Sequence, residues 1–447
     1  MSEALPAFQF YRETRLKEVE LNGRKVRIPE EWEVVELGEI AKFQRGYSYR
    51  RADLSETRTS KRFITINDLE KEGGVKRTAE RIYLKESVQV KERFILSPGD
   101  ILIANTDMTK GFIIGAPLII TSDLIPEDGI AVFSMDLTKL IFDKENINSH
   151  FLFYWLSWGT VRTIMKAFSQ GLNVQHLNHD LVKTVKVVLP PLEEQKKIAG
   201  VLRSIDEAIQ AIEESIAKLE RLKKGTMETL LTRGINHTRF KTVELNGRKV
   251  EIPEEWEVVE LGEVAERIKK SIDPQKLPNE LFELYSIPAF HETGKPEIVK
   301  GSSIKSTKFV IDVGVVLFGK LNPRIPKIWL VTGESDYKKI SSTEFIPLKP
   351  VRNLKSEFLY YALQDKYFIQ ISQQVVTGST PSRQRINPNK FMKLKIPLPP
   401  IEEQKKIAEI LRTIDGAIEA KREKREKLER MKRAVMEKLL TGEVRVR

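Results

Sequence analysis

Side chains suited to catalysis or metal binding are few in this 447-residue chain. His176 and His179 stand three positions apart with Asp180 beside them, and imidazole and carboxylate groups are common metal ligands. No other metal-binding pattern accompanies this triplet, so we interpret it as part of a polar loop and expect no metal. The chain contains no cysteine, which excludes disulfides, thiolate metal sites and a cysteine nucleophile, and favours a reducing compartment.

Motifs of covalent chemistry are also missing. The sequence contains no GxxxxGK[ST] phosphate loop, no strand followed by GxGxxG, no HExxH and no GxSxG. The amino-methyltransferase signature [DN]PP[YF] is absent too, because the Asn-Pro steps at Asn322 and Asn387 continue into Arg and Asn. We therefore expect that the chain is not an enzyme and holds no cofactor of its own.

Contact with a polyanion is the chemistry that the remaining polar residues favour. The net charge of +12 is concentrated in residues 40–188, with +4, and residues 264–397, with +10. Within both stretches, strand-like runs end in loops rich in Asn, Gln, Arg and Lys, the types that reach phosphates and base edges. The first stretch supplies the candidates Gln44, Arg45, Tyr47, Arg50, Arg51, Asn105, Thr106, Lys110, Asn173, Gln175 and His176. The second supplies Lys320, Asn322, Arg324, Lys327, Ser379, Thr380, Arg383, Gln384 and Arg385.

An internal repeat must position these loops. The segment VELNGRKVRIPEEWEVVELGE at residues 19–39 returns at 243–263 with one difference in 21 positions. LPPLEEQKKIAGVLRSIDEAI at 189–209 returns at 398–418 with 16 identities. The intervening stretches scarcely resemble each other, apart from echoes such as FLFYWL against FLYYAL. A shared fold with diverged surfaces explains this pattern, although a recent duplication or gene conversion would also explain the near-identical flanks.

A long helix is predicted after each Pro-Pro step. Two glutamates fall in its first turn, where they complement the helix dipole, and apolar residues then recur with the 4-3 spacing of a seam for a partner helix. The first helix should run to about Leu231, giving about 40 residues and roughly 60 Å. The seam residues are Ile198, Leu202, Ile205, Ile209, Ile212, Ile216 and Leu219 in the first helix and Ile407, Leu411, Ile414, Ile418 and Leu428 in the second.

The second helix interrupts its seam. Lys421 and Arg425 replace the apolar residues at the positions of Ile212 and Ile216, within the run KREKREK. This run is either a solvated face whose long stems cover the seam, or a surface that faces nucleic acid or pairs with Glu213 and Glu214 of the first helix. Because each helix must hide an apolar stripe, we expect them to pair with each other.

The repeated arm IPEEWEVVELGE is predicted to form a short connection followed by the alternating strand WEVVELGE, with Trp32 and Trp256 as core anchors. The predicted fold is α+β: two mixed α/β domains separated by two long helices that pair as an antiparallel intramolecular coiled coil, with a pseudo-twofold internal repeat. The expected segments are an arm at 1–39, a variable domain at 40–188, a helix at 189–234, an arm at 235–263, a variable domain at 264–397, a helix at 398–442 and a tail at 443–447.

These motifs in this order resemble the specificity subunit of type I restriction-modification enzymes. The resemblance rests on IPEEWEVVELGE, on IPLPPIEEQKKIAEILRTID and on the charged helix that ends in KLERMKRAVMEKLLTGEV, all present twice, and it covers nearly the whole chain. One departure is the interruption at Lys421 and Arg425, which makes the two helices unlike.

The resemblance implies that each variable domain is a target recognition domain that reads one half of a bipartite site in double-stranded DNA. It further implies that the helices set the gap between the halves and that the repeated regions dock two modification subunits. Those subunits would carry S-adenosylmethionine, and restriction subunits would add ATP- and Mg-dependent translocation and cleavage.

A protein of another class remains an alternative: a coiled-coil scaffold whose variable domains bind protein partners. DNA binding that weakens steeply with ionic strength would distinguish the specificity subunit from such a scaffold. No apolar run reaches the roughly 18 residues that cross a bilayer, and the N-terminus does not have the pattern of a signal peptide. We expect a cytoplasmic protein without a membrane partner.

Overall fold

The computed structural model describes residues 9–107, 112–171, 173–333, 335–378 and 383–446. The chain divides into two compact units: unit 1 contains the described residues up to Glu213 and from Lys424 onward, and unit 2 contains Glu214–Glu423. The candidates Lys110, Ser379 and Thr380 lie outside the described residues. Within the described part of the chain, no helix combines the length and apolar character needed to cross a bilayer.

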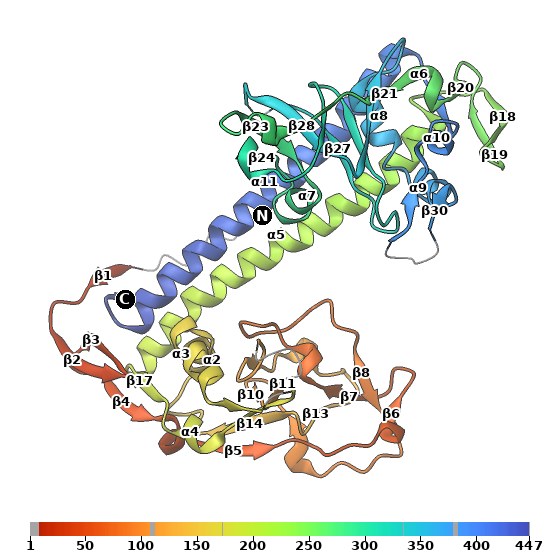
Figure 1. The fold of residues 1–447 in the computed structure, drawn as a ribbon. Coiled ribbons are helices and arrows are strands. Elements are labelled where there is room, and N and C mark those ends of the chain that lie inside the picture. Colours follow the sequence, from red (N-terminus) through yellow and green to blue (C-terminus); the bar gives the residue numbers. More distant parts are fainter. Residues whose placement is uncertain (1–8, 108–111, 172, 334, 379–382, 447) are drawn as a thin grey trace. The chain divides into compact units, whose positions relative to one another are not determined.

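Two long helices, α5 (Leu192–Arg233) and α11 (Ile401–Leu440), begin directly after the Pro-Pro steps, as predicted. Within unit 1 the start of α5 lies beside the end of α11, and within unit 2 the end of α5 lies beside the start of α11 (Figure 1), so the pair is antiparallel. All twelve predicted seam residues are buried or partly buried. The predicted coiled-coil pairing is therefore confirmed within each unit.

The basic run in α11 follows the first of its two interpretations. Lys421 and Arg425 are partly buried, as expected of stems that cover the seam. A cross-helix ion pair next to them joins Arg422 to Glu220 at 2.8 Å.

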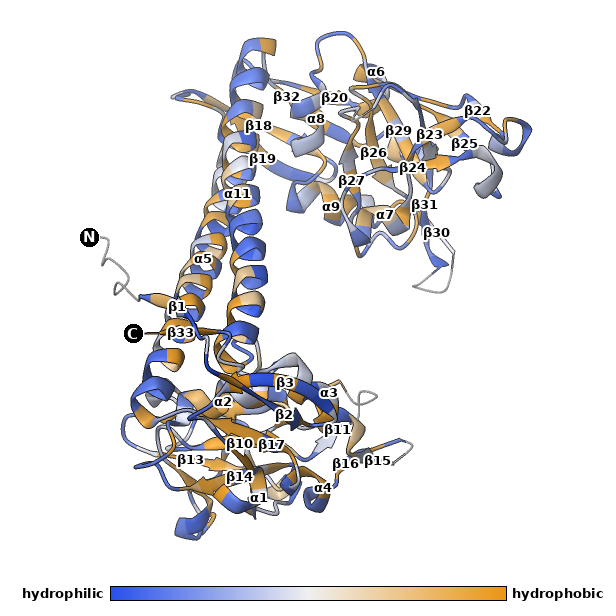
Figure 2. Cartoon of the chain, turned by 90° about the vertical axis from the view of Figure 1, so that its left-hand side faces the viewer, coloured by the Kyte–Doolittle hydropathy of each residue, from blue (hydrophilic) through white to orange (hydrophobic). Residues whose placement is uncertain are grey.

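The arm folds into a β-hairpin, one strand and a short helix. In unit 1, Asn22 and Gly23 at the hairpin turn both have positive φ, the conformation of a two-residue turn that matches strand twist. The arm elements of unit 1 are β2 (Leu16–Leu21), β3 (Arg24–Pro29), β4 (Glu33–Glu36) and α1 (Leu37–Ile40). Those of unit 2 are β18 (Phe240–Leu245), β19 (Arg248–Pro253), β20 (Glu257–Glu260) and α6 (Leu261–Val264). The hairpin strands are largely hydrophilic (Figure 2).

The predicted arm strand was too long. It ends at Glu36 because Glu36 and Glu39 form a capping box that starts α1, and Glu260 and Glu263 do the same at α6. Trp32 and Trp256 are fully buried, which confirms them as core anchors.

Each variable domain contains a four-stranded sheet of the same order. In unit 1 the order is β12 (Pro117–Ile119), β10 (Ile101–Ala104), β14 (Leu137–Phe142) and β5 (Ala41–Arg45). In unit 2 it is β27 (Ile328–Leu330), β26 (Val316–Gly319), β29 (Phe345–Pro350) and β21 (Ala265–Arg267). A short strand, β11 (Thr106–Asp107), follows β10 in unit 1.

A five-stranded sheet completes each variable domain. Unit 1 has β6 (Leu54–Ser55), β8 (Ile82–Leu84), β7 (Lys61–Ile64), β13 (Ile130–Phe133) and β9 (Ile95–Leu96). Unit 2 has β22 (Ser271–Ile272), β25 (Lys308–Val310), β28 (Lys338–Ser342), β23 (Leu281–Tyr285) and β24 (Glu297–Lys300). Both sheets contain one parallel strand pair, β7 with β13 and β23 with β28. The order β8–β7–β13–β9 corresponds to β24–β23–β28–β25, whereas the fifth strand lies at opposite edges, because β6 pairs with β8 and β22 with β25. The diverged sequences thus keep the same fold apart from this edge strand.

The other α-helices and strands of the variable domains follow the sheets along the chain, except α7, which lies between β23 and β24. In unit 1 they are β15 (Ser169–Gln170), β16 (Gln175–Leu177), β17 (Lys186–Leu189), α2 (Ser149–Ser157), α3 (Gly159–Ala167) and α4 (His179–Lys183). In unit 2 they are β30 (Val376–Thr377), β31 (Arg385–Ile386), β32 (Lys395–Leu398), α7 (Ile287–Glu292), α8 (Ser356–Ala362), α9 (Lys366–Ser372) and α10 (Pro388–Phe391). Strand β17 pairs with β4, and β32 pairs with β20, so each arm is joined to the end of its variable domain.

The first turn of each helix is held inside its unit by two side chains of the repeated EEQ motif. Glu194 accepts a hydrogen bond from the Trp32 indole at 3.1 Å, and Glu403 accepts one from Trp256 at 2.9 Å. The next residue, Gln195, accepts the backbone N–H of Asn148, which belongs to the variable domain. Gln404 does the same for Lys355 at 2.9 Å. The motif therefore ties arm, helix and variable domain together.

Unit 1 is closed by the two ends of the chain. Strand β1 (Phe10–Arg12) pairs with β33 (Val444–Val446), and Arg445 contacts three carboxylates: Glu13 at 2.6 Å, Glu31 at 2.5 Å and Glu194 at 2.6 Å. In unit 2 the chain is continuous at the equivalent place, and His237 contacts Glu403 at 2.9 Å. In unit 1, the pairing of β1 with β33 and the ion pairs of Arg445 thus join two segments that in unit 2 are consecutive along the chain.

Glu13 makes this closure sensitive to acid. Hydrogen bonds from the Arg15 backbone and from Arg445 lower the pKa of Glu13 from its ordinary 4.5 to about 2. Because the folded-state pKa is the lower one, the stabilisation is complete above about pH 5 and is lost as the pH falls toward 2. We expect Glu13→Gln to lower the melting temperature at pH 7 and to have a smaller effect at pH 3.

Thermal unfolding of both proteins across this pH range checks the prediction. Glu18→Gln is the matched control, because Glu18 pairs with Lys25 on the exposed hairpin and such pairs contribute little. A Glu13→Gln effect that is the same at pH 7 and pH 3 would contradict the assignment.

Candidate functional site

The loops predicted from sequence come together at one end of the four-stranded sheet in unit 1. After β10, the backbone N–H of Asn105 bonds the carbonyl of Asp136 at 2.7 Å, and β11 then pairs with β16 so that Thr106 stands opposite His176. Arg45, at the end of β5, stands opposite Thr138 on β14. We name Arg45, Thr106, Gln175 and His176 loop face 1.

Unit 2 assembles the same arrangement from a different sequence. Lys320 follows β26 and bonds the carbonyl of Glu344 at 2.7 Å, as Asn105 does with Asp136. The backbones of Leu321 and Arg385 form an isolated antiparallel β-bridge, and the backbone N–H of Asn322 donates to the carbonyl of Gln384 at 3.0 Å. We name Arg267, Lys320, Asn322 and Arg385 loop face 2. The predicted loops before and after the sheet are thus neighbours in both domains.

Loop face 2 concentrates positive charge around one carboxylate. Arg385 donates to both carboxylate oxygens of Glu344 at 3.1–3.3 Å, and this pairing raises the pKa of Arg385. Burial lowers the pKa of Lys320, Arg385 and Arg267 lower it further, and Glu344 opposes them. These shifts place three cations and one carboxylate in a single cluster that can attract an anion.

Two predicted contact residues are interior, and the prediction is corrected for them. Asn105 is 3% exposed: its side-chain oxygen accepts Thr138 Oγ1 at 2.8 Å and lies 2.5 Å from His179 Nε2. Lys327 is 4% exposed and donates to the carbonyls of Leu321, Asn322 and Ile325 at 3.0, 3.4 and 2.7 Å. Buried polar groups require hydrogen-bond partners, and these two side chains find theirs in neighbouring loop segments. Both side chains therefore hold the loops in place.

Other candidates lie elsewhere or make internal contacts. Gln44 donates to the carbonyl of Arg93, and the Tyr47 ring meets the edges of Phe63 and Phe94. Arg50 and Arg51 are exposed beside β6, on the five-stranded sheet rather than on loop face 1. The remaining exposed candidates are Asn173, Arg324 and Arg383, while Gln384 is partly buried.

Sequence reasoning missed Arg267, Asp136 and Glu344. Arg267 follows the second arm and donates to Asn389 Oδ1 at 3.3 Å. Its position after the arm is comparable to that of Phe43–Arg51, so treating both repeats alike would have identified it. Asp136 accepts a hydrogen bond from the Thr106 hydroxyl at 3.0 Å. Asp136 and Glu344 are negatively charged, and a search for residues that bind a polyanion does not select them.

The histidine triplet does not form a metal centre in the structure. His179 lies at the start of α4 against Asn105, and burial, with Arg45 and Lys183 nearby, lowers its pKa. His176 is exposed on β16. Across the described ranges, no group of three His, Cys, Asp or Glu side chains is arranged to hold a metal ion.

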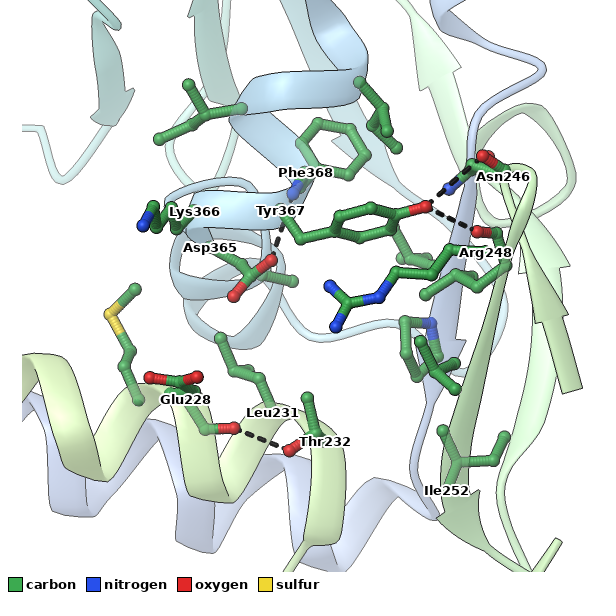
Figure 3. Close-up of a pocket in the computed structure, with 18 of the residues that line it drawn as sticks. Glu228, Leu231, Thr232, Asn246, Arg248, Ile252, Asp365, Lys366, Tyr367 and Phe368 are labelled. Carbon is green, nitrogen blue, oxygen red and sulfur yellow. Dashed lines mark hydrogen bonds between the residues drawn. The ribbon is translucent and has the colours of Figure 1, made fainter. Parts of the chain in front are cut away.

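A pocket of about 950 Å³ lies in unit 2 between the end of α5, the β18–β19 hairpin, α9 and β32. Its walls include Leu231, Ile252 and Phe368 (Figure 3). Tyr367 donates to the carbonyl of Leu245 at 2.8 Å, and the Arg248 guanidinium lies 5.2 Å from its ring. Apolar and charged side chains line the pocket together: the basic ones are Lys224, Arg233, Arg248, Lys249, Lys366 and Lys395, and the acidic ones are Glu228, Glu251 and Asp365.

The family model described as type I restriction modification DNA specificity domain matches residues 29–221 and 253–430. The chain belongs to this family. The two matched regions correspond to the two copies of the repeat.

Relatives in the type I specificity family match almost end to end. The chain is 29% identical to the type I restriction enzyme MjaVIII specificity subunit of Methanocaldococcus jannaschii, with 98% of each chain covered. It is 25% identical to the MjaIX specificity subunit of the same organism, again with 98% of each covered. The crystal structure of the type I S subunit from M. genitalium shares the fold, with a TM-score of 0.53 at 14% identity over 91% of this chain and 96% of that one.

We expect the buried loop residues of this specificity-family chain to matter for stability. Asn105→Ala should lower the free energy of unfolding by about 1–3 kcal/mol, because it removes an acceptor shared by Thr138 and His179. His176→Ala, a change at the exposed neighbour, should alter it by less than about 0.5 kcal/mol. Chemical denaturation measures both values, and equal effects would show that Asn105 is not a structural residue.

Proposed function

We propose that this chain is the non-catalytic DNA-reading subunit of its type I system, in which each loop face reads one half of a bipartite double-stranded DNA site. The observation that carries the proposal is the assembly of the same pair of loops in two domains with scarcely related sequences. A common frame with different exposed side chains is what two different half-sites require.

The side chains at the two faces support this role. Loop face 2 offers Arg267, Lys320 and Arg385, which suit phosphate oxygens and the acceptors of guanine. Loop face 1 offers one arginine, Arg45, together with the hydrogen-bonding side chains of Thr106, Gln175 and His176. We propose that the long helices set the gap between the two half-sites. The chain would work in the cytoplasm, where DNA is accessible.

Exchange of one variable domain tests the proposal. Replacing residues 40–188 with the equivalent region of another family member should change one half of the methylated sequence and leave the other half unchanged, because the two domains would read independently. Sequencing of methylated DNA from cells that also express the modification subunit measures this.

The reciprocal exchange of residues 264–397 is the control and should change the other half only. A methylation pattern that stays the same in both chimaeras would overturn the proposal.

We further propose that the repeated arms and helix ends recruit two modification subunits and, through them, restriction subunits. The support is the near identity of the two arms, which would present one docking surface twice. S-adenosylmethionine, ATP and Mg would then reside on the partner subunits. In unit 2 the docking surface would include the pocket beside the β18–β19 hairpin, whose lining combines apolar side chains with an excess of basic ones and so suits an apolar segment that also carries acidic residues.

A charge reversal at the pocket tests recruitment. Lys249→Glu should lower the number of modification subunits that co-purify with each chain from about two toward one, because it changes only the docking surface of unit 2, where exposed Lys249 would face acidic residues of the partner. Lys218→Glu, on an exposed face of α5 outside the pocket, is the control and should have no effect. Equal co-purification of the Lys249→Glu variant and the unchanged protein would remove the pocket from the docking surface.

A further inference from the structure

The echo FLFYWL against FLYYAL in the variable domains has a structural counterpart. Tyr154 of α2 donates its hydroxyl to Asp206 of α5 at 2.8 Å, and Tyr361 of α8 donates to Asp415 of α11 at 2.9 Å. Both tyrosines are buried, with 2% and 4% exposure. A variable domain is thus bonded to a long helix by the same group in each unit.

A lysine from the opposite helix completes each contact. In unit 1, Lys432 of α11 lies 2.6 Å from Asp206, with its ammonium 5.4 Å from the centre of the Tyr154 ring. In unit 2, Lys223 of α5 lies 2.7 Å from Asp415 and 5.7 Å from the Tyr361 ring. We name these two groups the Tyr–Asp–Lys clusters. The aspartates are 209 positions apart, as are the lysines, so the clusters are related by the repeat.

We infer that the Tyr–Asp–Lys clusters are positioning residues that fix the angle of each recognition domain on the helix pair and thereby the gap of the bipartite site. The inference rests on the proposed function and deepens it. Each cluster joins three elements at one point: the domain, the helix that leaves it and the antiparallel helix. A polar contact between domain and helix described above, at Gln195 or Gln404, lies at the start of the helix, about three turns before the aspartate. Unit 1 has a further one, in which Arg77 donates to Gln210 of α5 at 2.8 Å.

The magnitude of the effect follows from geometry. A tilt of about 10° over a domain diameter of about 30 Å moves the far edge by about 5 Å. The rise of one base pair is roughly 3.4 Å, so such a tilt would make neighbouring gaps accessible. Contacts at the start of the helix and further along it together oppose this tilt. Removing the contact at the aspartate should therefore weaken that opposition, and more so in unit 2 than in unit 1, where Arg77 and Gln210 also join domain and helix.

Retention of this contact in otherwise diverged domains supports a shared task. The Tyr154 and Tyr361 hydroxyls are held as donors, because burial and the neighbouring aspartates raise their pKa above the ordinary value of 10. The aspartate carboxylate accepts one hydrogen bond from the tyrosine hydroxyl and also pairs with the lysine ammonium, which makes the geometry specific.

Gap selectivity is the measurement that separates positioning from general stability. The full chain with its modification subunit is assayed against duplexes that carry the motif found by methylation mapping, at the native gap and at gaps one base pair shorter and longer. We expect Tyr361→Phe, and likewise Tyr154→Phe, to reduce the preference for the native gap at least threefold, since each keeps the ring and removes the hydrogen bond.

Tyr360→Phe is the matched control, because Tyr360 is the preceding residue on α8, and the preference should stay unchanged. Asp415→Asn provides a second variant that alters the cluster without a change of side-chain size. An unchanged gap preference in the Tyr361→Phe and Asp415→Asn variants, or an equal loss of binding at every gap, would overturn the inference. Failure of the unaltered complex to bind or methylate any bipartite duplex would instead overturn the proposed function.

Discussion

The structure depends on one carboxylate in the first turn of each long helix, buried at Glu194 and partly buried at Glu403. Glu194 and Glu403 each accept an indole N–H, from Trp32 and Trp256, and a cation or imidazole from the segment that ends the opposite helix. A buried carboxylate without such partners would destabilise its surroundings, so arm, helix start and helix end are required to meet at one place. The duplicated sequence places this constraint once in each unit, where it joins the arm to both long helices.

The sequence predicted the features that depend on local pattern. The 4-3 spacing gave both helices, and the repeated Trp in a hydrophobic context gave the core anchors. Exposure of loop residues was predicted less well: Asn105 and Lys327 carry the chemistry of nucleic-acid contacts, but the fold surrounds them with carbonyls and hydroxyls from distant segments. The residue type determines which groups a side chain can hydrogen-bond, but the tertiary structure determines which partner lies next to it. The spacing of residues in the sequence does not predict that partner.

The acidic residues at the loop faces show the same limit. Asp136 and Glu344 occupy equivalent turns and bond loop residues, Thr106 in unit 1 and Arg385 in unit 2. A search for basic side chains ignores them, although a carboxylate that holds an arginine in one orientation lowers the entropy cost of its later contacts. The hairpin at Asn22 and Gly23 was likewise readable from its turn residues once their positive φ requirement is considered.

The interleaving of the two units along the chain bears on the order in which they can form during synthesis. Unit 2 is one continuous segment, Glu214–Glu423, whereas unit 1 also needs the segment from Lys424 onward. The part synthesised first therefore waits for the part synthesised last, and until Arg445 arrives the carboxylates of Glu13 and Glu194 lack that cation. Unit 2 can complete its core before unit 1 does, although its residues leave the ribosome later. During that interval the first recognition domain would lack the part of its unit that the segment from Lys424 onward supplies.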